Sequence, residues 1–152
     1  MKIAVGSDDL YDIAKFIVEK LREKGIKIIE VGALREGKYY PWPKVGFEVG
    51  ELVAKGEADY GIVICYTGTG VCIATNKVKG VRAALCSDPR TAKYSRMWND
   101  ANVLALSARL VTKILVEEIL EEWLKVKEAD PSEEENIKMI YEYEIKASSK
   151  QS

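Results

Sequence analysis

Short apolar segments rich in Ile and Val alternate along this chain with segments whose apolar side chains recur at helical spacing. The apolar segments predict strands at 2–6, 25–32, 60–65, 81–86 and 102–108. Helical spacing predicts helices over 13–21, 45–55, 70–78, 89–98 and 111–123. The run YGIVIC at 60–65 is apolar at almost every position, which indicates a strand covered on both faces.

This alternation predicts an α/β fold, a three-layer α/β/α Rossmann-like sandwich with a five-stranded parallel sheet. One domain over residues 1–127 accommodates the whole pattern, because no repeat or interdomain linker interrupts it. Residues 33–43, with two prolines and two tyrosines, are expected to form an irregular surface loop. In such a sheet the ligand crevice lies at the carboxyl ends of the strands.

The C-terminal segment stands apart from this alternation. Asp130 followed by Pro131 is a helix-start signal, and it predicts an extra helix within residues 128–147. The apolar stripe of that helix consists of Ile137, Ile140, Tyr141 and Ile145. We expect the helix either to fold back on its own domain or, as we favour, to dock on a partner subunit. Residues 148–152 are expected to fray.

Composition excludes several classes of protein. The 23 Lys and Arg residues nearly balance the 24 Asp and Glu residues, so no electrostatic footprint indicates nucleic acid or an anionic membrane. The beginning MKIAVGSDD lacks the apolar stretch of a signal peptide, and an odd number of cysteines favours reduced thiols, so a cytoplasmic location is expected. With no histidine and no CxxC pair, neither a metal site nor a cofactor is predicted.

The most reactive sequence lies directly after the third predicted strand, where CYTGTG occupies residues 65–70. Glycines at 68 and 70 allow backbone N–H groups to turn toward a ligand. If a helix begins near Val71, its N-terminus and the N–H groups of Gly68, Thr69, Gly70 and Val71 would favour an oxyanion or a bound anion. The same field would favour the thiolate of Cys65 as a base or nucleophile. The residues alone leave open the alternative that Cys65 is a buried core cysteine.

Four stretches together resemble the ribose-5-phosphate isomerase B / galactose-6-phosphate isomerase family. They are GSD at 6–8, Cys-x-Thr-Gly-x-Gly at 65–70, ATNKVKGVRAALC at 74–86 and NDANVLAL at 99–106. The resemblance covers residues 1–127 in the same order. It implies an aldose–ketose isomerase of sugar phosphates that needs no metal, works as a dimer or tetramer and completes its active site across the subunit interface.

The resemblance also implies roles for individual residues. The cysteine matching Cys65 moves a proton between C1 and C2 through a cis-enediolate, and the glycine loop with Thr67 stabilises the enediolate oxygen. The position of Asn99 binds substrate, and Asp8 and Tyr40 fall on positions that line the pocket.

Several departures from the family pattern involve substrate binding. Asp9 stands where the family has a phosphate-contacting histidine, and Trp98 where it has a ring-opening histidine. The C-terminal arginines that hold the phosphate align with Ser132 and Asn136, and Tyr66 replaces a loop glycine. Asp9 and Trp98 are counted with Tyr66 as substrate-binding candidates, against the alternatives that Asp9 caps the first helix and Trp98 packs in an interface. Lys44, Arg90 and Arg96 are the cations considered as replacements for the phosphate clamp.

We therefore expect an isomerase of this family whose substrate, a sugar or sugar phosphate, is altered relative to ribose 5-phosphate. A short or acyclic substrate would fit the loss of the ring-opening histidine. The alternative from a different class is a non-catalytic sugar-binding paralogue or one subunit of a hetero-oligomeric isomerase. A third possibility is ordinary ribose-5-phosphate isomerase activity with relocated phosphate contacts.

Overall fold

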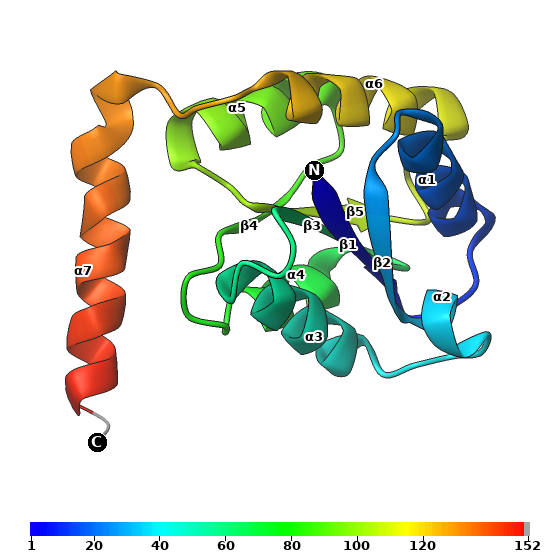
Figure 1. The fold of residues 1–152 in the computed structure, drawn as a ribbon, viewed down its shortest axis with the longest axis horizontal. Helices are drawn as coiled ribbons and strands as arrows, with labels where there is room; N and C mark the ends of the chain where they lie inside the picture. Colours follow the sequence, from blue (N-terminus) through cyan, green and yellow to red (C-terminus); the bar gives the residue numbers. More distant parts are fainter. Residues whose placement is uncertain (151–152) are drawn as a thin grey trace.

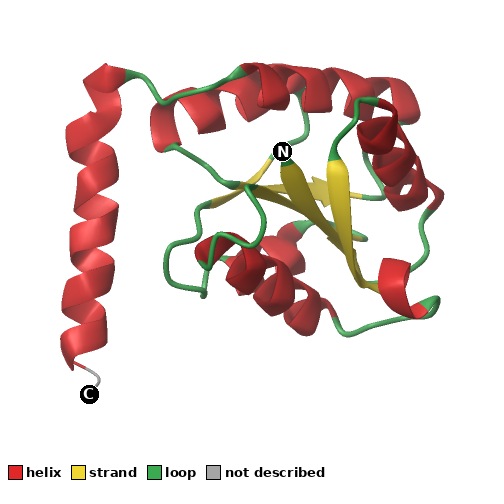
Figure 2. Cartoon of the chain, in the orientation of Figure 1, coloured by secondary structure: helices red, strands yellow, loops and turns green. Residues whose placement is uncertain are grey.

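The computed structural model describes residues 1–150, and its centre is a single five-stranded sheet. Its strands are β1 (Lys2–Ser7), β2 (Lys27–Gly32), β3 (Tyr60–Cys65), β4 (Ala83–Leu85) and β5 (Val103–Ser107), in the order β2-β1-β3-β5-β4. Every adjacent pair runs parallel. The predicted five-stranded parallel sheet with helices on both faces is therefore confirmed (Figures 1 and 2).

Helices on the two faces of the sheet bury two separate apolar cores. One face is covered by α1 (Asp12–Glu23), α5 (Pro89–Asn99) and α6 (Lys113–Lys125), and the other by α3 (Trp42–Ala54) and α4 (Thr69–Thr75) (Figure 1). Successive side chains of β3 alternate between them: Ile62 and Ile64 enter the first core, whereas Val63 and Cys65 enter the second. The Cys65 side chain consequently lies on the side of α3 and α4.

The segment 33–43 is more ordered than the expected irregular loop. It contains the short helix α2 (Ala33–Glu36), which ends at Gly37 in the left-handed conformation with φ 74°. The next helix, α3, begins at Trp42 rather than near Val45, with Pro43 in its first turn. Proline suits that position because the first N–H groups of a helix have no partner within the helix.

The chain reverses its direction of winding between β1 and β3. From β1 it moves outward to the edge strand β2 and then returns to place β3 on the other side of β1. Ser7 at the end of β1 pairs with Ile64, the neighbour of Cys65. Open α/β sheets bind ligands at the carboxyl ends of the strands where the winding reverses. The residues that follow β1 and end β3, Asp8 and Cys65, therefore lie in the position that favours a site.

The C-terminal helix α7 (Glu134–Lys150) follows a one-turn helix η1 (Pro131–Glu133) and stands beside the α/β body, away from the sheet (Figure 1). Its attachment is slight: the Gly80 N–H donates to the Glu144 carboxylate at 3.1 Å, and the Arg82 guanidinium lies 4.9 Å from the centre of the Tyr141 ring. The helix continues to Lys150, beyond the expected end at 147, and residues 151–152 lie outside the described part of the chain. Within residues 1–150, no helix combines the length and apolar character needed to cross a membrane.

Candidate active site

The thiol of Cys65 accepts a hydrogen bond from the loop that follows it. The Gly68 N–H lies 3.2 Å from the Cys65 Sγ, and the Cys65 side chain is 5% exposed. A backbone N–H that points at the sulfur fixes the position of the thiol and places a hydrogen-bond donor beside it. The loop thus returns the chain onto the cysteine and does more than join a strand to a helix.

Only glycine fits at position 68. Its φ is 77°, a left-handed conformation that side chains with a Cβ rarely adopt. A Cβ there would also lie 2.6 Å from Leu85 Cδ1 and 2.9 Å from the Leu106 carbonyl oxygen. The close approach of the loop to β5 and β4, and with it the aim of the Gly68 N–H, therefore depends on the missing side chain.

Helix α4 begins directly after this glycine. Its first hydrogen bond runs from the Cys72 N–H to the Gly68 oxygen at 3.2 Å. The N–H groups of Thr69, Gly70 and Val71 come before this bond and therefore have no acceptor within the helix. The hydroxyls of Thr67 and Thr69 lie 2.8 Å apart at the same end. The structure therefore gathers the expected loop residues into one cluster of donors beside Cys65.

The other two cysteines have ordinary structural surroundings. The Cys72 Sγ contacts the Ala83 oxygen at 3.6 Å, and burial raises the pKa of the Cys72 thiol. Cys86 is fully buried, and burial raises the pKa of its thiol to about 11. Cys65 is also buried, in the core on the side of α3 and α4, so the buried-core interpretation fits it as well as Cys86. What distinguishes Cys65 is the Gly68 N–H that donates to its sulfur.

Asp8 is the buried carboxylate of the site. Its backbone N–H donates to the Ile64 oxygen at 3.3 Å and its backbone oxygen accepts the Tyr40 N–H at 2.9 Å, so Asp8 lies between β3 and the loop before α3. The side chain is 8% exposed, and its Oδ1 atom has no hydrogen-bond partner among the described residues. Burial raises the pKa of the Asp8 carboxyl above its usual value. A buried oxygen without a partner carries a free-energy cost that a bound hydroxyl would remove.

Tyr11 brings a phenol to the same position. Its side chain is half-buried, packs against the core beneath α1 and is close enough to the Asp8 carboxylate to be affected by it. Burial and that carboxylate, with smaller contributions from Asp9 and Cys65, raise the pKa of the Tyr11 phenol well above its usual value. The phenol therefore keeps its proton at neutral pH.

The neighbouring acid, Asp9, is exposed, and its carboxylate accepts the N–H of the next residue, Leu10, at 2.8 Å. The suggestion that Asp9 caps the first helix is wrong: α1 begins at Asp12, its cap residue is Tyr11, and no side chain accepts a hydrogen bond there.

The hydroxyl of Tyr40 donates to the Glu48 carboxylate, which also pairs with Arg35 at 2.9 Å. Burial acts to raise the pKa of Glu48, but the hydrogen bonds donated by Tyr40 and Arg35 outweigh it and hold that pKa below its usual value. The Tyr40 hydroxyl thus donates its proton to Glu48, and the Tyr40 oxygen can still accept a hydrogen bond from a ligand.

The exposed residue Tyr66 is held in place by its backbone. Its carbonyl oxygen accepts the Arg109 N–H at 3.0 Å and the Ser107 hydroxyl at 2.9 Å. These contacts place Arg109, an exposed cation that follows β5, next to the Cys65 loop.

Trp98 and Asn99 lie at the opposite edge of the sheet. They end α5, which begins at the carboxyl edge and leads back to the start of β5. Val103 pairs there with Gly61, and four residues of β3, about 13 Å of strand, separate Gly61 from Cys65. Within one chain these two residues cannot reach Cys65. Trp98 is exposed, and its ring stacks on that of Tyr94 with centroids 4.1 Å apart.

The three candidate cations differ in their availability. Arg96 is 3% exposed, and its guanidinium donates to the oxygens of Ala101, Tyr60 and Val126, so it is not free to bind a phosphate. Arg90 and Lys44 are exposed, near the starts of α5 and α3 respectively. Among the described residues, no group of three or more metal-ligating side chains is placed to hold an ion.

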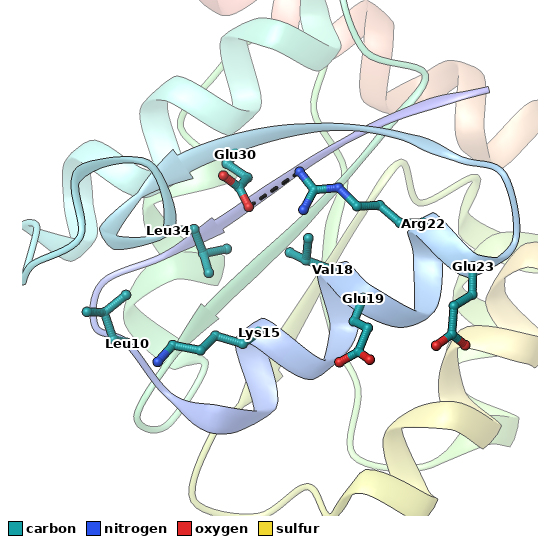
Figure 3. Close-up of a pocket in the computed structure, with 8 residues that line it drawn as sticks. All are labelled: Leu10, Lys15, Val18, Glu19, Arg22, Glu23, Glu30 and Leu34. Carbon is teal, nitrogen blue, oxygen red and sulfur yellow. Dashed lines mark ion pairs between the residues drawn. The ribbon is translucent and has the colours of Figure 1, made fainter.

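A groove of about 640 Å³ lies elsewhere, between α1 and the edge strand β2. Figure 3 shows Lys15, Glu19 and Arg22 lining it from α1, with an ion pair from Arg22 to Glu30 across it. It includes neither Cys65 nor any residue of its loop. Its lining contains no cysteine, and we place the candidate site at Cys65.

Sequence reasoning missed three residues of this site: Tyr11, Trp42 and Arg109. A Cβ at Gly70 would lie 3.0 Å from the Trp42 ring, so the Trp42 side chain packs closely against the loop. Tyr11 carried no signal, since a residue between a strand and a helix reads as a connection. Arg109, directly after the strand that pairs with β3, had a signal in its position at a carboxyl end.

Comparison with known proteins identifies the family. The family described as Ribose/Galactose Isomerase matches residues 3–140. Ribose-5-phosphate isomerase B of Escherichia coli K12 is 43% identical over 81% of this chain and 83% of its own length, and D-erythrulose-4-phosphate isomerase of Pectobacterium atrosepticum is 35% identical over 82% of each. The structure of Clostridium thermocellum ribose-5-phosphate isomerase B superposes with a TM-score of 0.90 at 40% identity, over 97% of this chain and 99% of that one. The chain with the Cys65 loop at its β1/β3 switch point belongs to the ribose/galactose isomerase family of sugar-phosphate isomerases.

Proposed function

We propose that the protein interconverts an aldose phosphate and its ketose, with Cys65 as the base. The observation that carries this proposal is the hydrogen bond from the Gly68 N–H to the Cys65 Sγ at a strand end where open α/β sheets bind ligands. A thiolate beside fixed N–H donors suits removal of a proton next to a carbonyl group, because the donors stabilise the charge that develops on oxygen.

The reaction balances with these groups alone. The Cys65 thiolate takes the proton from C2 of the open-chain aldose, and the electron pair moves to form a cis-enediol(ate) whose negative oxygen derives from the C1 carbonyl. The N–H groups of residues 68–71 and the Thr67 hydroxyl stabilise that oxygen. The thiol then returns the proton to C1, the proton of the C2 hydroxyl passes to the oxygen on C1, and the C2–O bond becomes the ketone carbonyl.

Arg109 is the cation best placed to bind the phosphate of the substrate. Its backbone is bonded to Tyr66, within the Cys65 loop, and its side chain is exposed. Asp9 on the other side would repel a phosphate dianion. The expectation of a substrate altered relative to ribose 5-phosphate remains a prediction, and a four-carbon sugar phosphate is its simplest form. Asp8, with an unpartnered oxygen, would hold a sugar hydroxyl.

We propose that Trp98 and Asn99 act in the site of a partner copy. The strand length that separates them from Cys65 excludes a role in their own chain's site, whereas an oligomer can bring one chain's amino edge to another's loop. Helix α7 is proposed to dock on that partner. Its exposed apolar side chains are unusually many for a single helix: Met139, Ile140, Tyr143 and Ile145.

A non-catalytic sugar-binding protein, or one half of a hetero-oligomer, is the second candidate. The observation that favours it is the acidic run Glu133–Glu135, at the C-terminal segment expected to bind phosphate by resemblance. In that case the protein would bind a sugar phosphate without exchanging its protons.

The test is solvent exchange at carbon. The protein is incubated in D2O with a panel of aldose and ketose phosphates of four to six carbons, and loss of the C1 or C2 proton signal is followed by NMR. Deuterium entry into one aldose–ketose pair establishes the reaction and names its substrate. Binding by the same compounds, with no exchange in any of them, would refute the isomerase and support the binding protein.

A further inference from the structure

The side chain of Ser107 reaches the Cys65 loop from the neighbouring strand. Ser107 is the last residue of β5, pairs with Cys65 and is 2% exposed. Its hydroxyl donates to the Tyr66 carbonyl oxygen at 2.9 Å, across 41 positions of the sequence. Paired residues of adjacent parallel strands direct their side chains to the same face of a sheet. The Ser107 hydroxyl and the Cys65 thiol therefore both lie on the side of α3 and α4.

Two donors hold the peptide unit that joins Tyr66 to Thr67. The Tyr66 oxygen accepts the Arg109 N–H at 3.0 Å as well as the Ser107 hydroxyl, so both of its acceptor positions are used. Each of these donors comes from the end of β5 or the turn that follows it. The peptide bonds of the described residues are all trans, and in a trans peptide the C=O and N–H groups point in opposite directions. The Thr67 N–H therefore points away from β5.

This orientation leaves the Thr67 N–H available to a ligand. Thr67 is exposed, and among the residues that the structure describes its N–H has no hydrogen-bond acceptor. It comes directly before the Gly68 N–H, which donates to the Cys65 Sγ. If the peptide unit turned over, the Tyr66 oxygen would take the place of this donor. An enediolate oxygen there would be repelled instead of stabilised.

The need of a buried hydroxyl for an acceptor does not by itself explain the Ser107 contact. Ser95 is 5% exposed, and its hydroxyl donates at 2.8 Å to the oxygen of Ala92, one turn back in the same helix. Ser107 instead donates to a different segment of the chain, the loop after β3. The conformation of that loop is thus tied to the end of β5 by a side chain.

We propose that Ser107 is a positioning residue for the isomerisation: its hydroxyl fixes the peptide unit of Tyr66 and Thr67 so that the Thr67 N–H donates to the enediolate oxygen. This inference rests on the proposed function. Ser107 acts through the peptide unit and does not touch the substrate. The oxygen carries its full charge only in the enediolate, so loss of the Ser107 hydroxyl weakens binding of the enediolate more than binding of the substrate.

Ser107→Ala removes the hydroxyl and little volume. For the aldose phosphate in which the wild type exchanges deuterium, we expect kcat to fall by about tenfold, the effect of one hydrogen bond, with KM within about twofold. The matched control is Ser95→Ala, which also removes a buried hydroxyl that donates to a backbone oxygen. This control should lose a similar amount of thermal stability and keep kcat within about twofold.

Two inhibitors separate the position of the donor from a general weakening of the fold. For a five-carbon substrate they are 4-phospho-D-erythronohydroxamate, whose anionic oxygen resembles that of the enediolate, and D-ribitol 5-phosphate, which has no such oxygen. Analogues with one carbon fewer or more serve the other chain lengths. By calorimetry, Ser107→Ala should bind the hydroxamate about tenfold more weakly than the wild type does and the alditol phosphate within about twofold.

A measurement on the wild type needs no variant. The amide proton resonance of Thr67 should move downfield when the hydroxamate binds and stay in place when the alditol phosphate binds, because only the first ligand offers it an anionic acceptor. A Thr67 resonance that ignores both bound ligands would overturn the proposal even if Ser107→Ala did not fold.

The remaining outcomes are distinguishable. If Ser107→Ala keeps the wild-type kcat, weakens both inhibitors equally or loses no more activity than Ser95→Ala, the Ser107 hydroxyl does not position a donor and the isomerase function stands. If the wild type exchanges no C–H proton in any sugar phosphate of the panel, the proposed function itself fails, and the positioning role fails with it.

Discussion

The Gly68 N–H points at the Cys65 Sγ from 3.2 Å, and this hydrogen bond joins a strand end to the helix that follows it. It exists because position 68 has no side chain and takes a left-handed conformation against β5. A local backbone requirement thereby distinguishes Cys65 from Cys72 and Cys86, which supports the proposal that Cys65 is the base.

Replacement of Cys65 by alanine should abolish proton exchange at carbon and lower isomerisation by about 1,000-fold, since it removes the proposed base, the thiol at which the Gly68 N–H points. NMR-detected exchange and a coupled rate assay measure the two effects. Cys72→Ala is the matched control, because its thiol contacts only Asn76 and a backbone oxygen, and it should keep activity within a few fold. Equal losses in the two variants would contradict the role given to Cys65.

Gly68→Ala should destabilise the protein by about 3 kcal/mol and remove most activity, because the new Cβ overlaps Leu85 and the Leu106 carbonyl. Gly25→Ala has nearly the same φ, 79°, but nothing lies within 4 Å of its Cβ, so it should cost only the strain of about 1 kcal/mol. Denaturant unfolding of both variants measures the difference. A loss at Gly25 as large as at Gly68 would show that strain, not overlap, dominates.

Mixing two inactive variants tests whether Asn99 acts across subunits. Cys65→Ala and Asn99→Ala, denatured together and refolded in equal amounts, should recover about a quarter of the wild-type activity, because mixed dimers contain one site with neither substitution. Each variant refolded alone gives the baseline. No recovery, with mixed dimers shown by mass spectrometry, would place Asn99 outside the partner's site.

Alkaline pH should destabilise the fold through Cys86. Burial raises the pKa of this thiol from 9.0 to about 11, so the native state holds the proton more tightly than the unfolded chain does. The resulting stability is fully present below pH 9 and is lost as pH rises toward 11, by about 2–3 kcal/mol. The free energy of unfolding of wild type and Cys86→Ala, measured from pH 8 to 11, should therefore converge as pH rises. A constant offset between the two curves would refute this linkage.

The order of elements and the proposed position of the candidate site follow from the sequence alone. Strand-length apolar runs alternate along the chain with segments of helical spacing, and few folds other than a parallel sheet between helices accommodate this order. In such a sheet, ligands bind at the carboxyl ends of the strands, where the polar residues of this chain lie. Gly68 and Gly70 after Cys65 were sufficient to predict a loop of N–H donors, because their conformational freedom is a property of the residue itself.

Only the tertiary structure decided which side chains meet there. Asp8 meets the end of β3 because the segment after β1 passes it, and Arg96 is excluded as a phosphate ligand because α5, β3 and the segment after α6 enclose it. Trp98 and Asn99 follow a helix that returns to the opposite edge, which separates them from Cys65 by the length of a strand. Sequence periodicity describes one element at a time, whereas these relationships depend on the distances between elements that packing sets.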